Sequence, residues 1–304
     1  MNESAWLEQW LQLQRLPATL GEDVQQHLLP WLQQELHACG HTLILGIHGC
    51  QGSGKSTLAA LLREWAQQHG LQAVCLSLDD YYLSRRQRRV LAKRIHPLLA
   101  TRGVPGTHDI HRLRVHLHWL RQGRTGFALP RFLKHRDDPA PFRTWPVITE
   151  KPRLVLFEGW CLGLPPLPIR LLQPPVNRLE AIRDPDGRWR AWVNRQLAGP
   201  YRPVWGLVDR WLMLRAPDFS CVERWRWQQE EHLRHKLQQT EGRNARTLDR
   251  PALKNFLMHF QRWTEHGLQA LPPRVHRCLW LNGQRRIIRA TGGSGRVGQA
   301  APGP

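Results

Sequence analysis

The chain has 304 residues and a mass of 35.5 kDa, and 41% of its residues are hydrophobic. This length suits one large domain or two small ones, and the hydrophobic content excludes a wholly disordered chain. Lysine and arginine number 44 against 24 acidic residues, which gives a net charge of +20 and makes nucleic acid a partner class to consider. Because the basic residues are spread out rather than grouped in one block, general composition is the favoured explanation of the charge.

The sequence lacks signals for a membrane span, for export or for a cysteine framework. No stretch of about 18 uninterrupted apolar residues occurs, so no transmembrane helix is predicted. The N-terminus carries Glu3 and Glu8 and has neither a basic start nor a small-residue cleavage site. The six cysteines are scattered without a C-x-x-C pair. We therefore expect a soluble, cytoplasmic protein.

The first part of the chain predicts a helical segment followed by a strand–helix–strand unit. Residues 1–40 form the expected N-terminal helical segment, with apolar residues at helical spacing from residue 5 to residue 38. The run HTLILGIH at 41–48 predicts a buried strand, and a helix over 55–68 and a strand over 72–78 follow. A unit of this kind implies a parallel sheet.

The rest of the chain is more irregular. The further expected elements are a helix with a loop over 81–96, a helix over 109–121, a strand over 153–157, a proline-rich loop over 165–175, a strand over 205–214, helices over 219–239 and 251–268, and strands over 275–281 and 285–289. Residues 291–304 are rich in Gly, Ala and Pro and predict a disordered tail. We expect an α/β fold with a parallel sheet and helices on both faces.

One short motif indicates a nucleotide site. The segment 49–56 has the sequence GCQGSGKS and matches G-x-x-x-x-G-K-[ST], with a predicted strand before it and a helix after it. Its glycines let backbone N–H groups turn toward a phosphate, Lys55 brings a cation to the transferred group, and the Ser56 hydroxyl reaches Mg²⁺. The alternative is a glycine-rich turn. The predicted ATP-binding residues are Gly49, Cys50, Gln51, Gly52, Ser53, Gly54, Lys55, Ser56 and Thr57.

Two acidic positions follow predicted strands. Asp79 and Asp80 come directly after the strand over 72–78, and Glu158 comes directly after the strand over 153–157. The carboxyl ends of parallel strands meet at one edge of a sheet, so these carboxylates are expected on the same rim as the phosphate loop. Phosphoryl transfer to a hydroxyl needs a base and a metal anchor. The alternatives are helix capping for the aspartates and a solvated loop carboxylate for Glu158.

Basic side chains are expected around the phosphates and the acceptor. Arg224 and Arg226 begin the predicted helix over 219–239, where an arginine on a lid is plausible, and the alternative is a surface helix with solvated charges. An anionic acceptor also needs basic partners. The candidates in loops between strands are Arg102, His108, Arg131 and Lys134.

Longer segments extend these short motifs into a family pattern. They have the sequences GIHGCQGSGKSTLA, SLDDYYL, RGVPGTHDI, LPRFLK, LFEGWCLG, DPDGRWRAWVNRQL and APDFSCVERWRWQQE. With these segments the chain resembles, from about Leu43 to Leu281, the bacterial and plant-type D-glycerate 3-kinases. That branch of the P-loop kinases includes uridine kinase, phosphoribulokinase and bacterial pantothenate kinase.

The resemblance implies roles for individual residues. Asp79, in the Asp-Asp-Tyr-Tyr segment, is implied as the base, and Glu158 is implied to lie near Mg²⁺, which Ser56 holds, or near the acceptor. The resemblance also favours Arg226 over Arg224 as the lid arginine. The predicted catalytic residues are thus Lys55, Asp79, Glu158 and Arg226. The predicted acceptor-side residues are Asp80, Tyr82, Arg102, His108, Asp109, Arg131 and Lys134.

The chain departs from the family pattern at one position. The family usually has PRFDK, with an aspartate where this chain has Leu133, although Lys134 and the later Asp137 and Asp138 remain. The departure concerns the acceptor and leaves ATP binding untouched.

These observations predict a kinase domain over 41–290 that uses ATP and Mg²⁺. The favoured reaction is phosphorylation of D-glycerate to 3-phosphoglycerate. The first alternative is another small hydroxyl acceptor, such as a nucleoside, a pantothenate-like acid or a sugar phosphate. The second is a nucleic-acid-stimulated NTPase, suggested by the charge but lacking a second RecA-like motif set. The third is a non-catalytic nucleotide-binding module, against which Lys55, Ser56, Asp79 and Glu158 argue because all are present.

Overall fold

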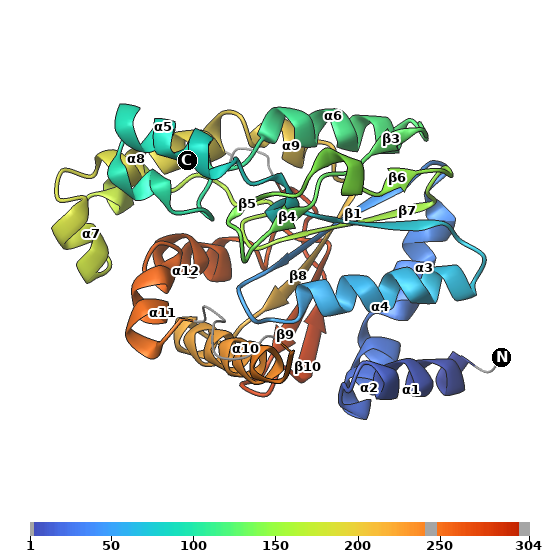
Figure 1. The fold of residues 1–304 in the computed structure, drawn as a ribbon. Helices are drawn as coiled ribbons and strands as arrows, with labels where there is room; N and C mark the ends of the chain where they lie inside the picture. The colour runs from blue at the N-terminus through green and yellow to red at the C-terminus, as the bar shows by residue number, and fades with distance from the viewer. Residues whose placement is uncertain (1–2, 241–247, 298–304) are drawn as a thin grey trace.

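The computed structural model describes residues 3–240 and 248–297, and within them the main sheet has six strands. The strands are β1 (Leu43–Gly49), β2 (Ala73–Ser77), β7 (Leu154–Gly159), β8 (Arg210–Arg215), β9 (Arg277–Leu281) and β10 (Ile287–Thr291). They lie in the order β10–β9–β8–β1–β7–β2. All of them except β2 are labelled in Figure 1. All neighbours pair in parallel except β10, which is antiparallel to β9. The predicted α/β fold with a parallel sheet is confirmed.

Helices cover both faces of this sheet. They are α1 (Glu3–Leu13), α2 (Ala18–His27), α3 (Leu29–Ala38), α4 (Lys55–Gln68), α5 (Arg85–Arg94), α6 (Ile110–Arg121), α7 (Arg178–Arg183), α8 (Arg188–Ala198), α9 (Arg202–Trp205), α10 (Phe219–Thr240), α11 (Arg250–Leu257) and α12 (Gln261–Ala270). In Figure 1, α6 and α9 lie above the sheet, and α4 and α10 lie below it. Within the described ranges, no helix is both long enough and apolar enough to cross a membrane.

Short elements connect the larger ones on the upper side. Two small antiparallel pairs join β3 (Phe127–Ala128) to β6 (Val147–Ile148) and β4 (Phe132–Leu133) to β5 (Asp138–Pro139). The 3₁₀ helices are η1 (Leu78–Tyr81), η2 (Pro97–Ala100), η3 (Phe142–Thr144) and η4 (Ile169–Leu172).

The core strands explain the position of the site. Every residue of β1 and of β7 is buried, as expected for parallel strands covered by helices on both faces. The register pairs Ser77, the last residue of β2, with Glu158 in β7. Glu158 is also opposite Ile47 in β1. The carboxyl ends of these strands therefore meet at one edge, where the phosphate loop begins.

The N-terminal segment consists of three helices, α1 to α3. Arg15 has a φ of +53° and Pro17 precedes α2, and these residues separate α1 from α2. Asp23 in α2 is buried, and its carboxylate accepts hydrogen bonds from Nε of Arg286 at 3.0 Å and from the backbone N–H of Ile287 at 2.8 Å. The segment is thus fastened to β10, and the domain boundary at residue 40 stays a prediction.

Two predicted elements in the C-terminal part differ from those in the structure. The helix predicted over 251–268 is divided into α11 and α12, because the chain bends to bury Phe260 against Trp160, with ring centroids 5.0 Å apart. The strand predicted over 205–214 begins only at Arg210, because α9 occupies the preceding turn.

A third correction concerns the tail. Disorder from residue 291 is wrong for 291–297, since Thr291 ends β10 and Val297 is 7% exposed. Val297 lies against Gly163, where a Cβ would stand 2.5 Å from its methyl group. Pairing with β9 and burial against the core outweigh the local Gly-rich composition. Residues 298–304 lie outside the described part of the chain.

Candidate active site

The phosphate loop connects β1 to α4. Gly52 and Gly54 have φ angles of +79° and +93°, which side chains other than glycine rarely allow. A Cβ on Gly52 would also stand 2.7 Å from Cβ of Trp225, so α10 packs directly on the loop. Helix α4 begins at Lys55 and adds the positive end of its dipole. The strand–loop–helix context predicted for this motif is present.

Several buried polar atoms of the loop and of the neighbouring Glu158 have no hydrogen-bond partner in the described residues. They are Oγ of Ser53, both side-chain amide atoms of Gln51, and Oε2 of Glu158. A buried polar atom without a hydrogen bond costs free energy, so such atoms indicate groups that a ligand supplies. Phosphate oxygens accept from Ser53 and Gln51, and a cation suits Oε2 of Glu158. The residues present therefore fit a nucleotide phosphate with a divalent metal.

Glu158 links the loop to the end of β2. Its Oε1 accepts hydrogen bonds from the hydroxyl of Ser56 at 3.0 Å and from that of Ser77 at 2.7 Å, and Nζ of Lys55 lies 4.0 Å from Oε2. Glu158 is 6% exposed, which excludes the solvated loop carboxylate. In the described residues no group of three or more His, Cys, Asp and Glu side chains is arranged for a metal. One carboxylate with phosphate oxygens and water is the environment that Mg²⁺ prefers.

Asp79 is held at the rim by two side chains. Its Oδ1 accepts from the Tyr82 hydroxyl at 2.9 Å, and its Oδ2 lies 2.7 Å from Nζ of Lys134. Burial acts to raise the pKa of Asp79, but Lys134, Lys55 and the hydrogen bond from Tyr82 outweigh it and hold the pKa well below its usual range. Asp79 is thus an ionised carboxylate within the influence of the P-loop lysine.

The carboxylate of Asp80 has different partners from that of Asp79. Its carboxylate accepts from the backbone N–H of Phe132 at 3.0 Å and from Nη1 of Arg131 at 3.3 Å. Burial raises the pKa of Asp80. Asp80 and Arg131 thus fasten the β4 segment, which carries Lys134, beside the end of β2. The cap of η1 is supplied by the Ser77 side chain rather than by either aspartate.

Arg102 is paired with an acid that is not among the predicted site residues. Its Nη1 donates to Oδ1 of Asp137 at 2.6 Å, and Nη2 of the fully buried Arg88 lies 2.7 Å from the same oxygen. Asp137 has a φ of +56° in the turn between β4 and β5. No local pattern distinguishes this aspartate, because one partner comes from α5 and the other from the segment after η2, both distant in sequence.

The segment around residue 108 supplies one buried ring and one helix cap. His108 is 4% exposed, and its ring stacks on that of Tyr82 with centroids 4.6 Å apart. Asp109 is the N-cap of α6, where its Oδ1 accepts from the backbone N–H of Arg112 at 3.1 Å. The structure gives Asp109 a capping role, and a contact with the acceptor stays a prediction.

Arg285 donates a side-chain hydrogen bond to the phosphate loop. Arg226 forms an ion pair with Glu230 on its own helix. Nε of Arg285, in the turn between β9 and β10, donates to the carbonyl of Gly52 at 2.7 Å. Its guanidinium also lies over the Trp225 ring at 5.0 Å from the centroid. Sequence reasoning missed Arg285, because it lies in a basic turn far from every motif.

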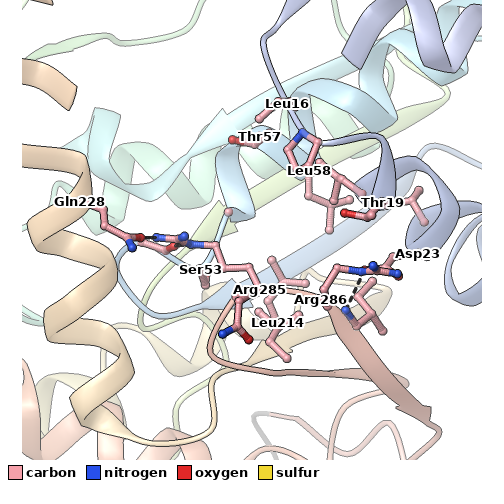
Figure 2. Close-up of a pocket in the computed structure, with 18 of the residues that line it drawn as sticks. Leu16, Thr19, Asp23, Ser53, Thr57, Leu58, Leu214, Gln228, Arg285 and Arg286 are labelled. Atoms are coloured by element: carbon pink, nitrogen blue, oxygen red, sulfur yellow. Dashed lines mark hydrogen bonds and ion pairs between the residues drawn. The ribbon is translucent and has the colours of Figure 1, made fainter. Parts of the chain in front are cut away.

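A cavity of about 320 Å³ opens beside the phosphate loop, as Figure 2 shows. Its wall includes Leu16 and Thr19 from the N-terminal segment, Thr57 of α4 and Gln228 of α10. Arg286, paired with Asp23, closes one side. The pocket thus joins four parts of the chain that are distant in sequence.

Two known proteins are similar to this chain in sequence. No protein-family model matches the chain. It is 33% identical over 230 residues to the uncharacterized kinase mug58 of Schizosaccharomyces pombe, covering 71% of this chain and 80% of that protein. It is 31% identical over 202 residues to the chloroplastic D-glycerate 3-kinase of Arabidopsis thaliana, covering 63% of this chain. The chain spans 42% of the length of that second relative.

Solved structures share the fold. A D-glycerate 3-kinase from Cryptococcus neoformans var. grubii superposes with a TM-score of 0.64 at 23% identity, over 84% of this chain and 90% of that one. The YGR205w protein superposes with a TM-score of 0.60 at 20% identity, over 89% of this chain and 95% of that one. Both likenesses support the fold described above.

Proposed function

The chain belongs to the D-glycerate 3-kinase family of P-loop kinases, and from this premise we propose that it transfers the γ-phosphoryl group of ATP to a hydroxyl of D-glycerate. The products are ADP and 3-phosphoglycerate. The observation that carries the proposal is the ionised Asp79, held by Tyr82 and Lys134 beside the P-loop lysine. A phosphate cradle next to a fixed carboxylate base is the arrangement that transfer to a hydroxyl requires.

Asp79 acts on the acceptor. The carboxylate accepts the proton of the reacting hydroxyl as its oxygen forms a bond to the γ-phosphorus, and the bond from that phosphorus to the bridging oxygen of ADP breaks. Lys134 and Tyr82 keep the two carboxylate oxygens oriented. Orientation of this kind lowers the entropic cost of bringing the reacting groups together.

Positive charge over the phosphates comes from the loop side. Lys55 neutralises charge on the transferred group, and Arg285, already bound to the carbonyl of Gly52, is the second cation available to the phosphates. Ser56 and Glu158 are the residues that hold Mg²⁺, which when bound neutralises charge on the phosphate oxygens. Arg226 reaches the same region only if it leaves Glu230.

The cavity beside the loop receives the base of the nucleotide. It adjoins Ser53, Gly54 and Thr57, so a base there stays connected to phosphates in the cradle. Its volume of about 320 Å³ lies at the lower end of ordinary ligand pockets.

The acceptor side carries the basic groups that an acid needs. Lys134 and Arg102 are each paired with an aspartate, Asp79 and Asp137 respectively. Paired cations of this kind are positioned in advance, and a bound carboxylate adds further hydrogen bonds to them. Leu133, where the family usually has aspartate, is paired in register with Asp138 in the small β4–β5 hairpin.

The direct test is ADP release from purified protein with Mg-ATP. D-glycerate is compared with other hydroxy acids, nucleosides, sugar phosphates and RNA. We expect turnover with D-glycerate that falls about 10³-fold in Asp79→Asn, since loss of a general base costs 10²–10⁴-fold. The matched control is Asp186→Asn, an exposed aspartate remote from the loop, which keeps wild-type turnover. ADP release stimulated by RNA and by no small acceptor would overturn the proposal.

A further inference from the structure

A buried tyrosine lies behind the acceptor side of the site. Tyr201 has no exposed surface, and its hydroxyl lies 2.6 Å from Nδ1 of His108. Tyr201 follows α8 and is 93 residues from His108 in the sequence. None of the motifs includes this tyrosine, and it does not reach the phosphate loop.

The direction of this hydrogen bond follows from the other partners of the tyrosine oxygen. The backbone N–H of Gly106 donates to it at 2.8 Å. Among the described residues, the one remaining hydrogen-bond partner of this oxygen is Nδ1 of His108. Because a buried O–H needs an acceptor, the hydroxyl of Tyr201 donates to Nδ1 of His108.

This direction fixes the proton of the histidine ring. An imidazole whose Nδ1 accepts a hydrogen bond carries its proton on Nε2 when neutral. Burial lowers the pKa of His108 to about 3, so the ring is neutral at working pH. The Nε2 atom is buried and has no hydrogen-bond partner among the described residues. His108 thus has an N–H donor that nothing in the described part of the chain satisfies.

The unsatisfied donor belongs to a ring that packs beside the proposed base. The His108 ring stacks on Tyr82, and the hydroxyl of Tyr82 donates to Asp79. Asp79 is also the charged group that acts on His108. The base, Tyr82, His108 and Tyr201 form one continuous series of contacts.

From these contacts we infer that Tyr201 is a positioning residue that fixes His108 as a neutral Nε2–H donor to an oxygen of the hydroxy-acid acceptor. The inference rests on the proposed function for the identity of that acceptor. It explains why this buried histidine nitrogen has no hydrogen-bond partner among residues 3–240 and 248–297. It also means that the acceptor substrate must carry an oxygen within reach of Nε2–H of His108, since a substrate without that oxygen leaves the donor unpaired.

A second tyrosine–histidine pair provides a matched control. The hydroxyl of Tyr81 lies 2.9 Å from Nδ1 of His116, and both residues are buried. His116 lines a separate groove of about 650 Å³ formed by α6 and the β3–β6 hairpin. Its Nε2 is not among the buried atoms without a partner in the described residues. Tyr81→Phe therefore removes an equivalent hydroxyl without reaching the unsatisfied donor.

The tautomer is measured first, on the free protein. Long-range ¹⁵N–¹H spectra, assigned with the His108→Gln variant, are expected to show the proton of His108 on Nε2 in the wild-type protein. In Tyr201→Phe the signal moves to the Nδ1–H form or to a mixture. A wild-type ring with its proton on Nδ1, or a spectrum that Tyr201→Phe leaves unchanged, would overturn the inference.

Kinetics then measures the effect on each substrate. Tyr201→Phe is expected to raise the KM for D-glycerate about tenfold, the loss of one hydrogen bond of ordinary strength, with the KM for ATP unchanged. Tyr81→Phe leaves both values at the wild-type level. If Tyr201→Phe is too unstable to measure, His108→Leu is compared with His108→Gln, which keeps an N–H donor and has the smaller increase. An equal rise in the KM for D-glycerate and in the KM for ATP would mean that Tyr201 has only a structural role.

The two hypotheses fail in different ways. If the wild-type protein does not phosphorylate D-glycerate, the proposed acceptor is wrong, whereas the ¹⁵N spectra of the free protein still decide the state of His108. If D-glycerate is phosphorylated but the tautomer or the KM is insensitive to Tyr201→Phe, the inference fails and the proposed function stands.

Discussion

The phosphate loop and the acceptor side are built in different ways. The loop is one contiguous segment, residues 49–57, whose shape depends on glycines with positive φ and on the start of α4. The acceptor side depends on pairs of side chains that are far apart in sequence. Lys134 reaches Asp79 across 55 residues, and Tyr201 reaches His108 across 93. A cradle made of backbone N–H groups needs only the right local conformation, whereas a pocket made of side chains needs the whole fold.

This difference predicts which kinetic constants change when a residue in each region is substituted. Changes in the loop affect phosphoryl transfer to every acceptor, because all acceptors share ATP. Changes on the acceptor side act on the acceptor alone.

The largest effect is expected for Lys55→Ala. This change removes the cation next to the transferred group, and we expect kcat to fall about 10³-fold with every acceptor and little change in acceptor KM. Steady-state kinetics with two different acceptors measures both quantities. Lys93→Ala, on the exposed face of α5, is the control. A loss confined to one acceptor would contradict the separation of the two sides.

The second largest effect is expected for Glu158→Gln. The glutamine keeps the size of the side chain but removes the charge beside Ser56 and Lys55. We expect about 10²-fold lower kcat and about tenfold more Mg²⁺ for half-maximal rate, since a charged ligand or its water-mediated equivalent is lost. The rate is measured against Mg²⁺ at fixed ATP. Ser77→Ala, which removes one hydrogen bond to the same carboxylate, gives a smaller increase. An unchanged Mg²⁺ dependence would exclude Glu158 from the metal site.

Lys134→Gln tests the acceptor side through pH. Lys134 helps to lower the pKa of Asp79, so its removal raises that pKa. Because a protonated Asp79 cannot accept a proton, activity is lost as pH falls through this pKa, and the acid limb of kcat/KM moves to higher pH. At pH 7 we expect about tenfold lower kcat/KM for the acceptor, from the lost charge-assisted hydrogen bond.

The pH profile of Lys134→Gln is recorded from acid to neutral pH beside that of Lys93→Gln, which keeps the wild-type limb. If the acid limb of kcat/KM does not move in Lys134→Gln, Asp79 is not the group that accepts the proton.

The smallest effect is expected for Asp23→Asn. This residue and Arg286 connect the N-terminal helices to β10 at the edge of the cavity. We expect the KM for ATP to rise about threefold and the KM for the acceptor to stay constant, since a partly exposed ion pair contributes little. Arg188→Gln, in an exposed pair with Asp186, is the control. A change in acceptor KM would mean that the N-terminal segment serves the other side of the site.

Much of the nucleotide side followed from the sequence alone. The helix over 55–68 is found with the predicted bounds as α4, and the strands that flank it lie within two residues of expectation. Glycine spacing, a buried apolar run and a helix start are local signals, and each has a direct backbone consequence. The same reasoning placed Asp79 and Glu158 at the carboxyl ends of neighbouring strands, because parallel strands end at one edge.

Only the tertiary structure decided which side chains meet. The side chain of Arg285 donates to the phosphate loop whereas that of Arg226 pairs with Glu230. Asp137 pairs with Arg102, and Tyr201 pairs with His108. None of these partners has a periodic or motif-like signal, since each contact joins segments that fold together only when the sheet and its loops are complete. Backbone conformation is determined by near neighbours, and so the sequence by itself determined the cradle. The direction of side chains across a pocket depends on packing between distant segments, and so the acceptor site was decided by the fold.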